Sequence, residues 1–182
     1  MTSPVGRALV VAIILVVCGG ALPGCGGAPS GPETFTYQLL PASSPTDDDG
    51  SSIASQCTGS GVALPVSEPL SGSFTLGPAE EQTADVSMFT INNIAFRSAS
   101  YTVNGQSGTL SLTMSNMQRP LAMTVMVDIN GEPVELTANG SQATFSGSPP
   151  TLRDVPLSGQ AGACGVGGVQ AYMLTVFAAP EI

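Results

Sequence analysis

The 182-residue chain contains no lysine, histidine or tryptophan, and its cationic side chains are four arginines against 13 acidic residues. Charged residues make up 9% of the sequence, where about 25% is usual. Because phosphate binding needs cationic side chains, we expect no nucleic-acid partner. The missing histidine and lysine also remove the usual neutral-pH general base, the commonest metal ligand and Schiff-base chemistry. We therefore expect a protein that is not an enzyme, with no catalytic residues and no cofactor.

The first 24 residues have the pattern of a signal peptide. Arg7 precedes an apolar run over residues 8–17, which ends in small residues and Pro23. Ten apolar residues cannot cross about 30 Å of hydrocarbon as a helix, which takes about 20 residues. We therefore predict that residues 1–24 are a cleaved leader, in preference to a transmembrane helix.

The leader ends in Leu22-Pro23-Gly24-Cys25, with an aliphatic residue three positions before the cysteine and a small residue directly before it. This segment resembles the lipobox of bacterial lipoprotein precursors. The resemblance implies attachment of diacylglycerol to the Cys25 sulfur, cleavage before Cys25 and acylation of the new amine. Two or more acyl chains give stable membrane anchoring. We expect an exported protein held at the cell envelope by lipid. In the family that the segment resembles, an aspartate after the cysteine often keeps the protein at the inner membrane of Gram-negative bacteria. Gly26 stands at that position, so the resemblance implies the outer membrane in a Gram-negative host.

The mature chain, with three arginines and 13 acidic residues, has a net charge of −10. Residues 25–33 consist of the lipidated cysteine and a Gly/Ser/Pro-rich spacer, which predicts a flexible tether. Apolar and polar residues then alternate with period two, as in Thr109–Met114, and no stretch has helical spacing. We predict that residues 34–182 form a single all-β domain, an antiparallel sandwich or small barrel of about eight or nine strands.

Turn residues support this prediction. Asn104-Gly105, Asn130-Gly131 and Asn139-Gly140 each separate two strand-like runs. Asn-Gly supplies the positive φ angles of a type I′ hairpin. The three pairs therefore predict three hairpins in an antiparallel meander.

Residues 41–69 are rich in Ser, Pro and Asp and predict a long polar loop. Within it, Asp47, Asp48 and Asp49 are weak calcium candidates, since calcium needs several oxygen ligands at once. The EF-hand spacing fails, because Pro45 occupies the first ligand position and Gln56 the last. A solvated acidic loop is the favoured interpretation, and we expect no metal site.

Two cysteines remain after Cys18 leaves with the leader and Cys25 takes lipid. Cys57 and Cys164 would be exported to a compartment that permits disulfides, and we predict that they form one. A catalytic thiol is disfavoured, because no histidine or lysine is present to generate the thiolate.

These features predict a structural or binding role, with the membrane as one partner through the lipid anchor and an envelope protein or a glycan as another. One alternative is a β-barrel carrier of a lipid or other apolar ligand, with an adaptable methionine lining. The methionines concerned are Met114, Met117, Met123, Met126 and Met173. A second alternative is a carboxylate-based hydrolase using Glu80, Glu81 or Asp85, although the sequence contains nothing that would raise a carboxyl pKa.

Overall fold

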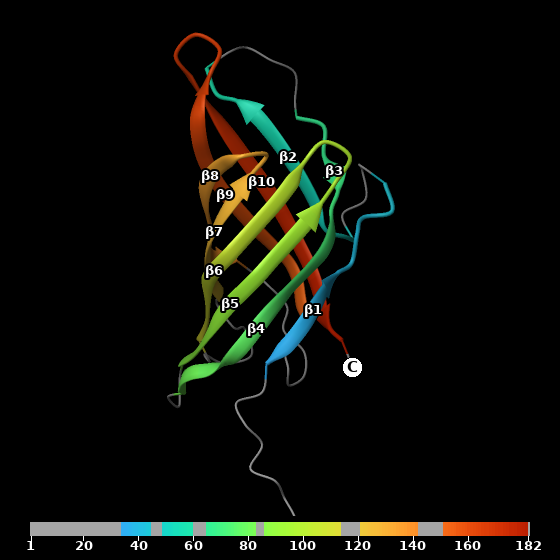
Figure 1. The fold of residues 1–182 in the computed structure, drawn as a ribbon, viewed down its shortest axis with the longest axis vertical. Coiled ribbons are helices and arrows are strands. Elements are labelled where there is room, and N and C mark those ends of the chain that lie inside the picture. The colour runs from blue at the N-terminus through green and yellow to red at the C-terminus, as the bar shows by residue number, and fades with distance from the viewer. Residues whose placement is uncertain are drawn as a thin grey trace, which may run out of the picture. The chain divides into compact units, whose positions relative to one another are not determined.

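The computed structural model describes residues 34–44, 49–59, 65–82, 86–113, 121–141 and 151–181, which form an all-β domain (Figure 1). Ten strands belong to one antiparallel sheet. They are β1 (Phe35–Leu39), β2 (Ser52–Cys57), β3 (Glu68–Pro69), β4 (Ser71–Gln82), β5 (Val86–Arg97), β6 (Thr102–Thr113), β7 (Leu121–Ile129), β8 (Glu132–Ser141), β9 (Leu152–Cys164) and β10 (Gly168–Pro180). The described residues contain no helix long and apolar enough to cross a bilayer.

The sheet closes because β1 pairs with β4 on one side and with β10 on the other. The ring of eight strands follows the order β1-β4-β5-β6-β7-β8-β9-β10, so that ring neighbours follow one another as in an up-and-down meander. The ring is uneven, since β8 and β9 pair at the single position Thr137 and Ser158. The predicted all-β antiparallel class is confirmed, and the closure makes the fold an irregular barrel.

The alternation that predicted strands separates the core from the surface. In β7, Met123, Val125, Val127 and Ile129 are all buried, and the residues between them are exposed or half-buried. The rings of Tyr37 and Phe74 stack at 5.0 Å, and Phe96 meets Phe74 edge-on at 6.3 Å. Burial raises the pKa of Tyr37 to about 12. The core cluster draws on every ring strand, so the interior of the described barrel is packed with side chains.

β1 and β2 are two halves of one interrupted strand. Both pair with the same edge of β10, with Leu39 opposite Ala178 and Ser52 opposite Thr175. Between these two pairs β10 advances three residues while the other chain advances 13, so a segment of ten residues, 41–50, leaves the strand. The strand resumes in phase after this segment, because the side-chain period of two is preserved.

Ser51 lies where segment 41–50, which we call the excursion, returns to the strand. Its side chain is polar and fully buried. Its Oγ accepts a hydrogen bond from the Phe177 N–H (2.9 Å) and donates one to the Phe177 carbonyl (2.8 Å). Its backbone N–H donates to the Leu40 carbonyl (2.6 Å). Its carbonyl accepts from Ala42 and Leu70, so Ser51 joins β10, both ends of the excursion and the start of β4.

The structure corrects the expected loop at 41–69, because β2 and β3 lie inside this segment. Ile53 is fully buried, and β2 pairs with β10 over six residues. The backbone hydrogen bonds of β10 thus order a segment whose own composition is typical of a loop.

Two of the three predicted hairpin turns are wrong. Asn104-Gly105 lies inside β6 and Asn139-Gly140 inside β8. Asn130-Gly131 is the turn between β7 and β8, with positive φ angles of 54° and 92°. Gly105 is a glycine for another reason, since a Cβ there would lie 2.7 Å from the Met126 carbonyl oxygen and 2.9 Å from Val127 Cγ1.

Candidate functional site

The predicted cysteine pair is a disulfide in the structure. Cys57 at the end of β2 and Cys164 at the end of β9 are bonded, with their Cα atoms 5.7 Å apart. Gly165 and Gly167 have positive φ angles in the turn that follows Cys164. The bond therefore joins two strands that flank β10, at the end of the barrel where the β9–β10 hairpin turns.

The other predicted site residues lie mostly outside the described residues. These are the lipidation candidate Cys25 and two of the calcium candidates, Asp47 and Asp48. Asp49 is described, beside the buried Gly50. Among the described residues, no group of three or more Asp, Glu, Cys or His side chains gathers as a metal site would require.

The tyrosines near the disulfide belong to the wall of the domain. Tyr101 and Tyr172 meet edge-on with ring centroids 6.4 Å apart. The Tyr101 hydroxyl shares a 2.7 Å hydrogen bond with Ser55 Oγ. Tyr172 is buried, and burial, followed by the Glu132 carboxylate and Tyr101, raises its pKa. Neither ring is a flat exposed platform of the kind on which a sugar stacks.

The described methionines do not share one lining. Met123 lies in the core, whereas Met126 and Met173 are 49% and 39% exposed on the outer surface. Met114 and Met117 lie outside the described residues. The described side chains thus form no common methionine surface inside the barrel.

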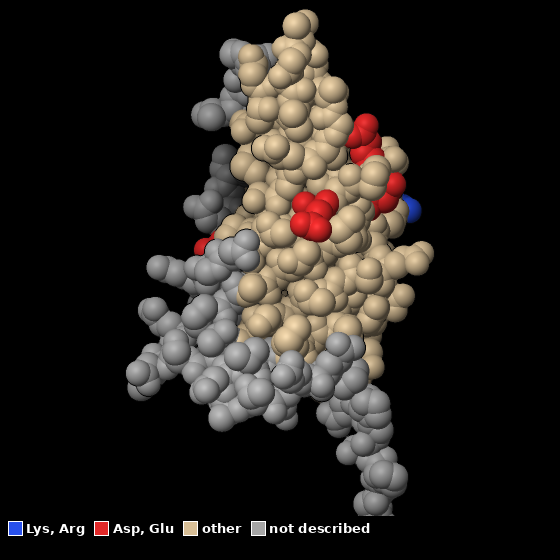
Figure 2. All heavy atoms as spheres, turned by 90° about the vertical axis from the view of Figure 1, so that its left-hand side faces the viewer, with Lys and Arg blue, Asp and Glu red and all other residues tan. Residues whose placement is uncertain are grey.

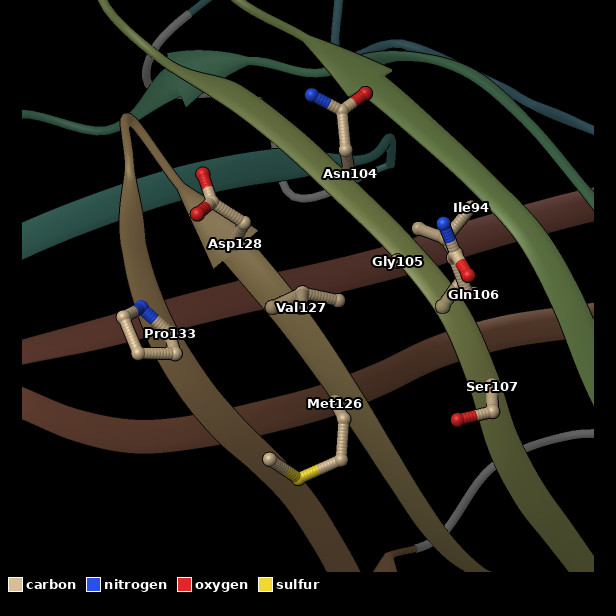
Figure 3. Close-up of a pocket in the computed structure, with 9 residues that line it drawn as sticks. All are labelled: Ile94, Asn104, Gly105, Gln106, Ser107, Met126, Val127, Asp128 and Pro133. Carbon is tan, nitrogen blue, oxygen red and sulfur yellow. The ribbon is translucent and has the colours of Figure 1, made fainter.

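An open hollow of about 560 Å³ lies over β6, β7 and β8, with the buried Ile94 of β5 among its lining residues (Figure 3). We call it the β6–β8 hollow. Its lining residues are Ile94, Asn104, Gly105, Gln106, Ser107, Met126, Val127, Asp128 and Pro133. A volume of this size lies within the range of about 300–1,000 Å³ that is typical of ligand sites.

Two cross-strand rows border the hollow. Asn104 of β6, Asp128 of β7 and Pro133 of β8 are register partners and form one row. Ser107 and Met126 are partners in the other, and Figure 3 shows their side chains on neighbouring strands. The exposed side chains of both rows belong to the outer face of the sheet, because partners directly opposite each other project to the same side.

A β-bulge opens the space between these rows. Gln106 is the extra residue of β6, inserted where the pairing shifts between Gly105 and Ser107. β5, which pairs with β6 on the side away from β7, is irregular at the same level. Asn93 of β5 has a φ of 53°, and the register of β5 against β4 shifts beside it. Asn92 of β5 contacts the bulge. With its side-chain nitrogen turned toward the neighbouring carbonyl oxygens, Asn92 donates to the Gln106 carbonyl (3.1 Å). Bulges bend a strand and redirect its side chains, often beside functional sites.

The hollow offers hydrogen-bonding groups around apolar side chains. The amides of Asn104 and Gln106 can both donate and accept, as can the Ser107 hydroxyl. Asp128 accepts from the Gly131 N–H (2.6 Å), which holds the carboxylate at the rim. The residues that line the hollow include no cation and no aromatic ring. This chemistry suits a ligand that carries both donors and acceptors and is neutral or positively charged.

Sequence reasoning missed the hollow, although β6 contains a signal for it. Gly105 and Gly108 interrupt a strand pattern, and a glycine inside a strand often marks a bulge or a close approach. At Gly108 a Cβ would lie 2.6 Å from Val125 Cγ1. The Asn-Gly pair was instead interpreted as a turn.

Comparison with known proteins identifies no relative, since no family model, no curated protein and no solved structure matches the chain.

Proposed function

We propose that this chain is a lipid-anchored, non-enzymatic binding protein of the cell envelope, and that the β6–β8 hollow holds a neutral-to-basic polypeptide segment of another envelope protein. The observation that carries the proposal is the hollow itself, with its amide, hydroxyl and carboxylate groups around Met126 and Val127. The lipobox-like segment ending at Cys25 supports the anchor.

The chemistry of the hollow favours polypeptide over glycan. A peptide backbone presents alternating donors and acceptors, which match amide side chains. Met126 is exposed and flexible, and methionine adapts to varied peptide surfaces. Asp128 lies in the rim and Glu135 is the register partner of Met126, so a cationic side chain on the ligand would be attracted. With a net charge of −9 in the whole chain, long-range steering also favours a basic partner.

The anchor is tested by expressing the full chain with Cys25→Ser and with the control Cys18→Ser. We expect mass spectrometry to show acyl chains on Cys25 of the wild type and of Cys18→Ser, and Cys25→Ser to leave the membrane fraction. An unmodified Cys25 at a mature N-terminus, or an intact leader, would contradict the anchor.

The ligand class is tested by NMR on the isotopically labelled mature chain, with a synthetic alternating Lys-Ala peptide and with chitotetraose as the two probes. We expect the peptide to shift the amide signals of Gly105–Ser107 and Met126–Asp128, and chitotetraose to leave them in place. At about 1 M salt, where the screening length is about 3 Å, the peptide effect should weaken.

The matched controls are two amides. Gln106→Ala should lower the peptide affinity, and Gln160→Ala, which removes an exposed amide from β9 on another part of the ring, should not. Shifts caused by chitotetraose at the same residues, or equal effects of the two variants on peptide affinity, would contradict the proposal that the hollow binds a polypeptide.

A further inference from the structure

Large exposed apolar side chains concentrate on β10 and beside it. Among the described residues six such side chains are exposed, and four of them lie on β10, on its turn or next to it. Val169 and Met173 belong to β10 and are 38% and 39% exposed. Val166 is fully exposed in the β9–β10 turn, and Leu40, 46% exposed, donates its N–H to Phe177 of β10. This distribution sets β10 apart from the other strands.

The outward residues of β10 and its two neighbours form a surface without charged side chains. Along β10, Ala171, Met173 and Thr175 alternate with the buried Tyr172 and Leu174. Their register partners on β2 and β9 complete three cross-strand rows. The rows are Gln56, Ala171 and Gln160; Ala54, Met173 and Ser158; and Ser52, Thr175 and Pro156. Ala54 is 8% exposed, so the accessible part of the middle row is Met173 and Ser158. We call this surface, together with Val166, Val169 and Leu40, the β10 face.

No charged residue occurs in this part of the chain. Residues 50–67 and 155–180, which contain β2, most of β9 and all of β10, include no Asp, Glu, Lys or Arg. Figure 2 shows the same contrast, because the end formed by the β9–β10 hairpin is without charge in that view while carboxylates gather lower on the domain. Depletion of charge around exposed apolar residues is typical of the centre of a protein interface.

A covalent bond and several hydrogen bonds hold the β10 face in place. The Cys57–Cys164 disulfide joins its two flanking strands. Thr58 donates its N–H and its hydroxyl to the Val169 carbonyl (both 2.9 Å), and its hydroxyl accepts from the Val169 N–H (3.1 Å). Ser51 bonds both backbone groups of Phe177. A surface that is ordered before binding loses less entropy on association.

We propose that the β10 face is the surface on which a second copy of this chain docks. Two copies of a chain with 13 acidic residues repel each other, and on the β10 face they meet without bringing carboxylates together. A lipid surface fits less well, because interfacial insertion relies on Trp, Tyr, Lys and Arg side chains and the outward residues of this face include none.

The size of the face matches a weak dimer. From Val166 to Phe177 the chain advances about 36 Å at roughly 3.3 Å per residue, and three strands about 4.8 Å apart span about 14 Å. Each copy would then cover on the order of 500 Å², and the dimer about 1,000 Å² in total. That area lies at the low end of specific interfaces, so we expect association that depends on concentration in the membrane.

The test uses the full chain in its native membrane, expressed as two copies with different tags. Met173→Cys provides a thiol at the centre of the face, and Ala122→Cys provides an exposed control thiol on β7. With a short bis-maleimide we expect a covalent product that carries both tags from Met173→Cys and none from Ala122→Cys. No product at residue 173, equal products at both positions, or a product with a different protein would overturn the proposal.

A second substitution separates docking from random collision. Added to Met173→Cys, Ala171→Asp places like charges against each other and should reduce the two-tag product at least about tenfold, whereas Ala122→Asp should leave it unchanged. Retention of the Cys57–Cys164 disulfide and of cooperative melting shows that each variant is folded. A folded Ala171→Asp variant with undiminished product would refute the β10 face, and neither result depends on whether the β6–β8 hollow binds peptide.

Discussion

Ser51 shows how one hydroxyl can hold a strand at its break. Its Oγ satisfies both the N–H and the carbonyl of Phe177 in a site from which water is excluded. Ser51→Ala would leave the buried Phe177 N–H without this partner, whereas the Phe177 carbonyl would keep the hydrogen bond from the Leu40 N–H (2.8 Å). A buried unsatisfied group costs about 1–3 kcal/mol. We expect the free energy of unfolding, measured by urea denaturation, to fall by about 1–3 kcal/mol.

The control for this substitution is Ser158→Ala, an exposed serine on β9, which should change the free energy of unfolding by less than about 0.5 kcal/mol. Equal effects of the two variants would mean that the Ser51 hydroxyl is not a structural group.

Glu68 gives the domain a defined response to acid. The Ser100 hydroxyl (2.6 Å), the Ser98 hydroxyl (2.8 Å) and the Ser100 N–H (2.9 Å) all donate to its carboxylate. They hold the pKa of Glu68 below its ordinary value of 4.5. A carboxyl with a lowered folded-state pKa contributes stability above the unfolded pKa and loses it as pH falls through the folded value.

Glu68→Gln should therefore lower the melting temperature at neutral pH, and the difference from the wild type should shrink as pH falls below 4.5. Thermal melts across this range measure the effect. A difference that stays constant with pH would show that the carboxylate charge plays no part.

At the residue scale, the sequence predicts a feature correctly where the residue type has one dominant structural role in that setting. Cys57 and Cys164 were paired by elimination, and the positive φ angles of Asn130 and Gly131 follow from the chemistry of hairpin turns. Gly105 was wrongly predicted to lie in a turn. Glycine is needed there because Met126 and Val127 of β7 leave no room for a Cβ atom. Local sequence does not contain that distance.

At the scale of elements, the pairing of β1 and β2 with β10 predicts that the excursion, residues 41–50, can be deleted without changing the order or register of the ring strands. Leu40 lies opposite Phe177 and Ser52 opposite Thr175, which leaves one β10 position for Ser51. The Ser51 nitrogen already lies 2.6 Å from the Leu40 carbonyl oxygen. Deletion of residues 41–50 should therefore give a continuous strand in the native register.

We expect the deletion variant to fold, to melt cooperatively and to form the Cys57–Cys164 disulfide, as measured by circular dichroism and non-reducing peptide mapping. Deletion of nine residues, 42–50, is the matched control, because a one-residue slip exchanges the two faces of a strand. Equal stability of both deletions would contradict the interrupted-strand description.

The existence of most strands could be predicted from the alternation of apolar and polar residues, which places Leu110, Val134 and Leu136 in the core. The continuity of β1 with β2 could not, because it appears only in their common pairing with β10. The hollow could not be predicted for the same reason, since the bulge at Gln106 is defined by its partners on β7. Pairing across strands is the information that a single sequence lacks.

At the scale of the whole molecule, the disulfide closes a loop of 107 residues that includes most of the ring. The chain-entropy estimate for a loop of this length is about 4.7 kcal/mol, an upper value. The double variant Cys57→Ser with Cys164→Ser should lose up to that amount in the free energy of unfolding. Wild-type chain treated with reductant should lose the same amount, and an unchanged value in both would show that the bond is dispensable.

The order of the ring has a consequence for any paired form of the protein. β7, the middle strand of the hollow, is three strands from β10 in one direction around the ring and five in the other, so the β10 face and the β6–β8 hollow lie on different sides of the barrel. Two copies joined along β10 would leave both hollows outside their interface. Such a pair would be a bivalent receptor. It could bridge two separate partners, or bind two sites on one repetitive partner with the avidity that comes from a raised effective concentration.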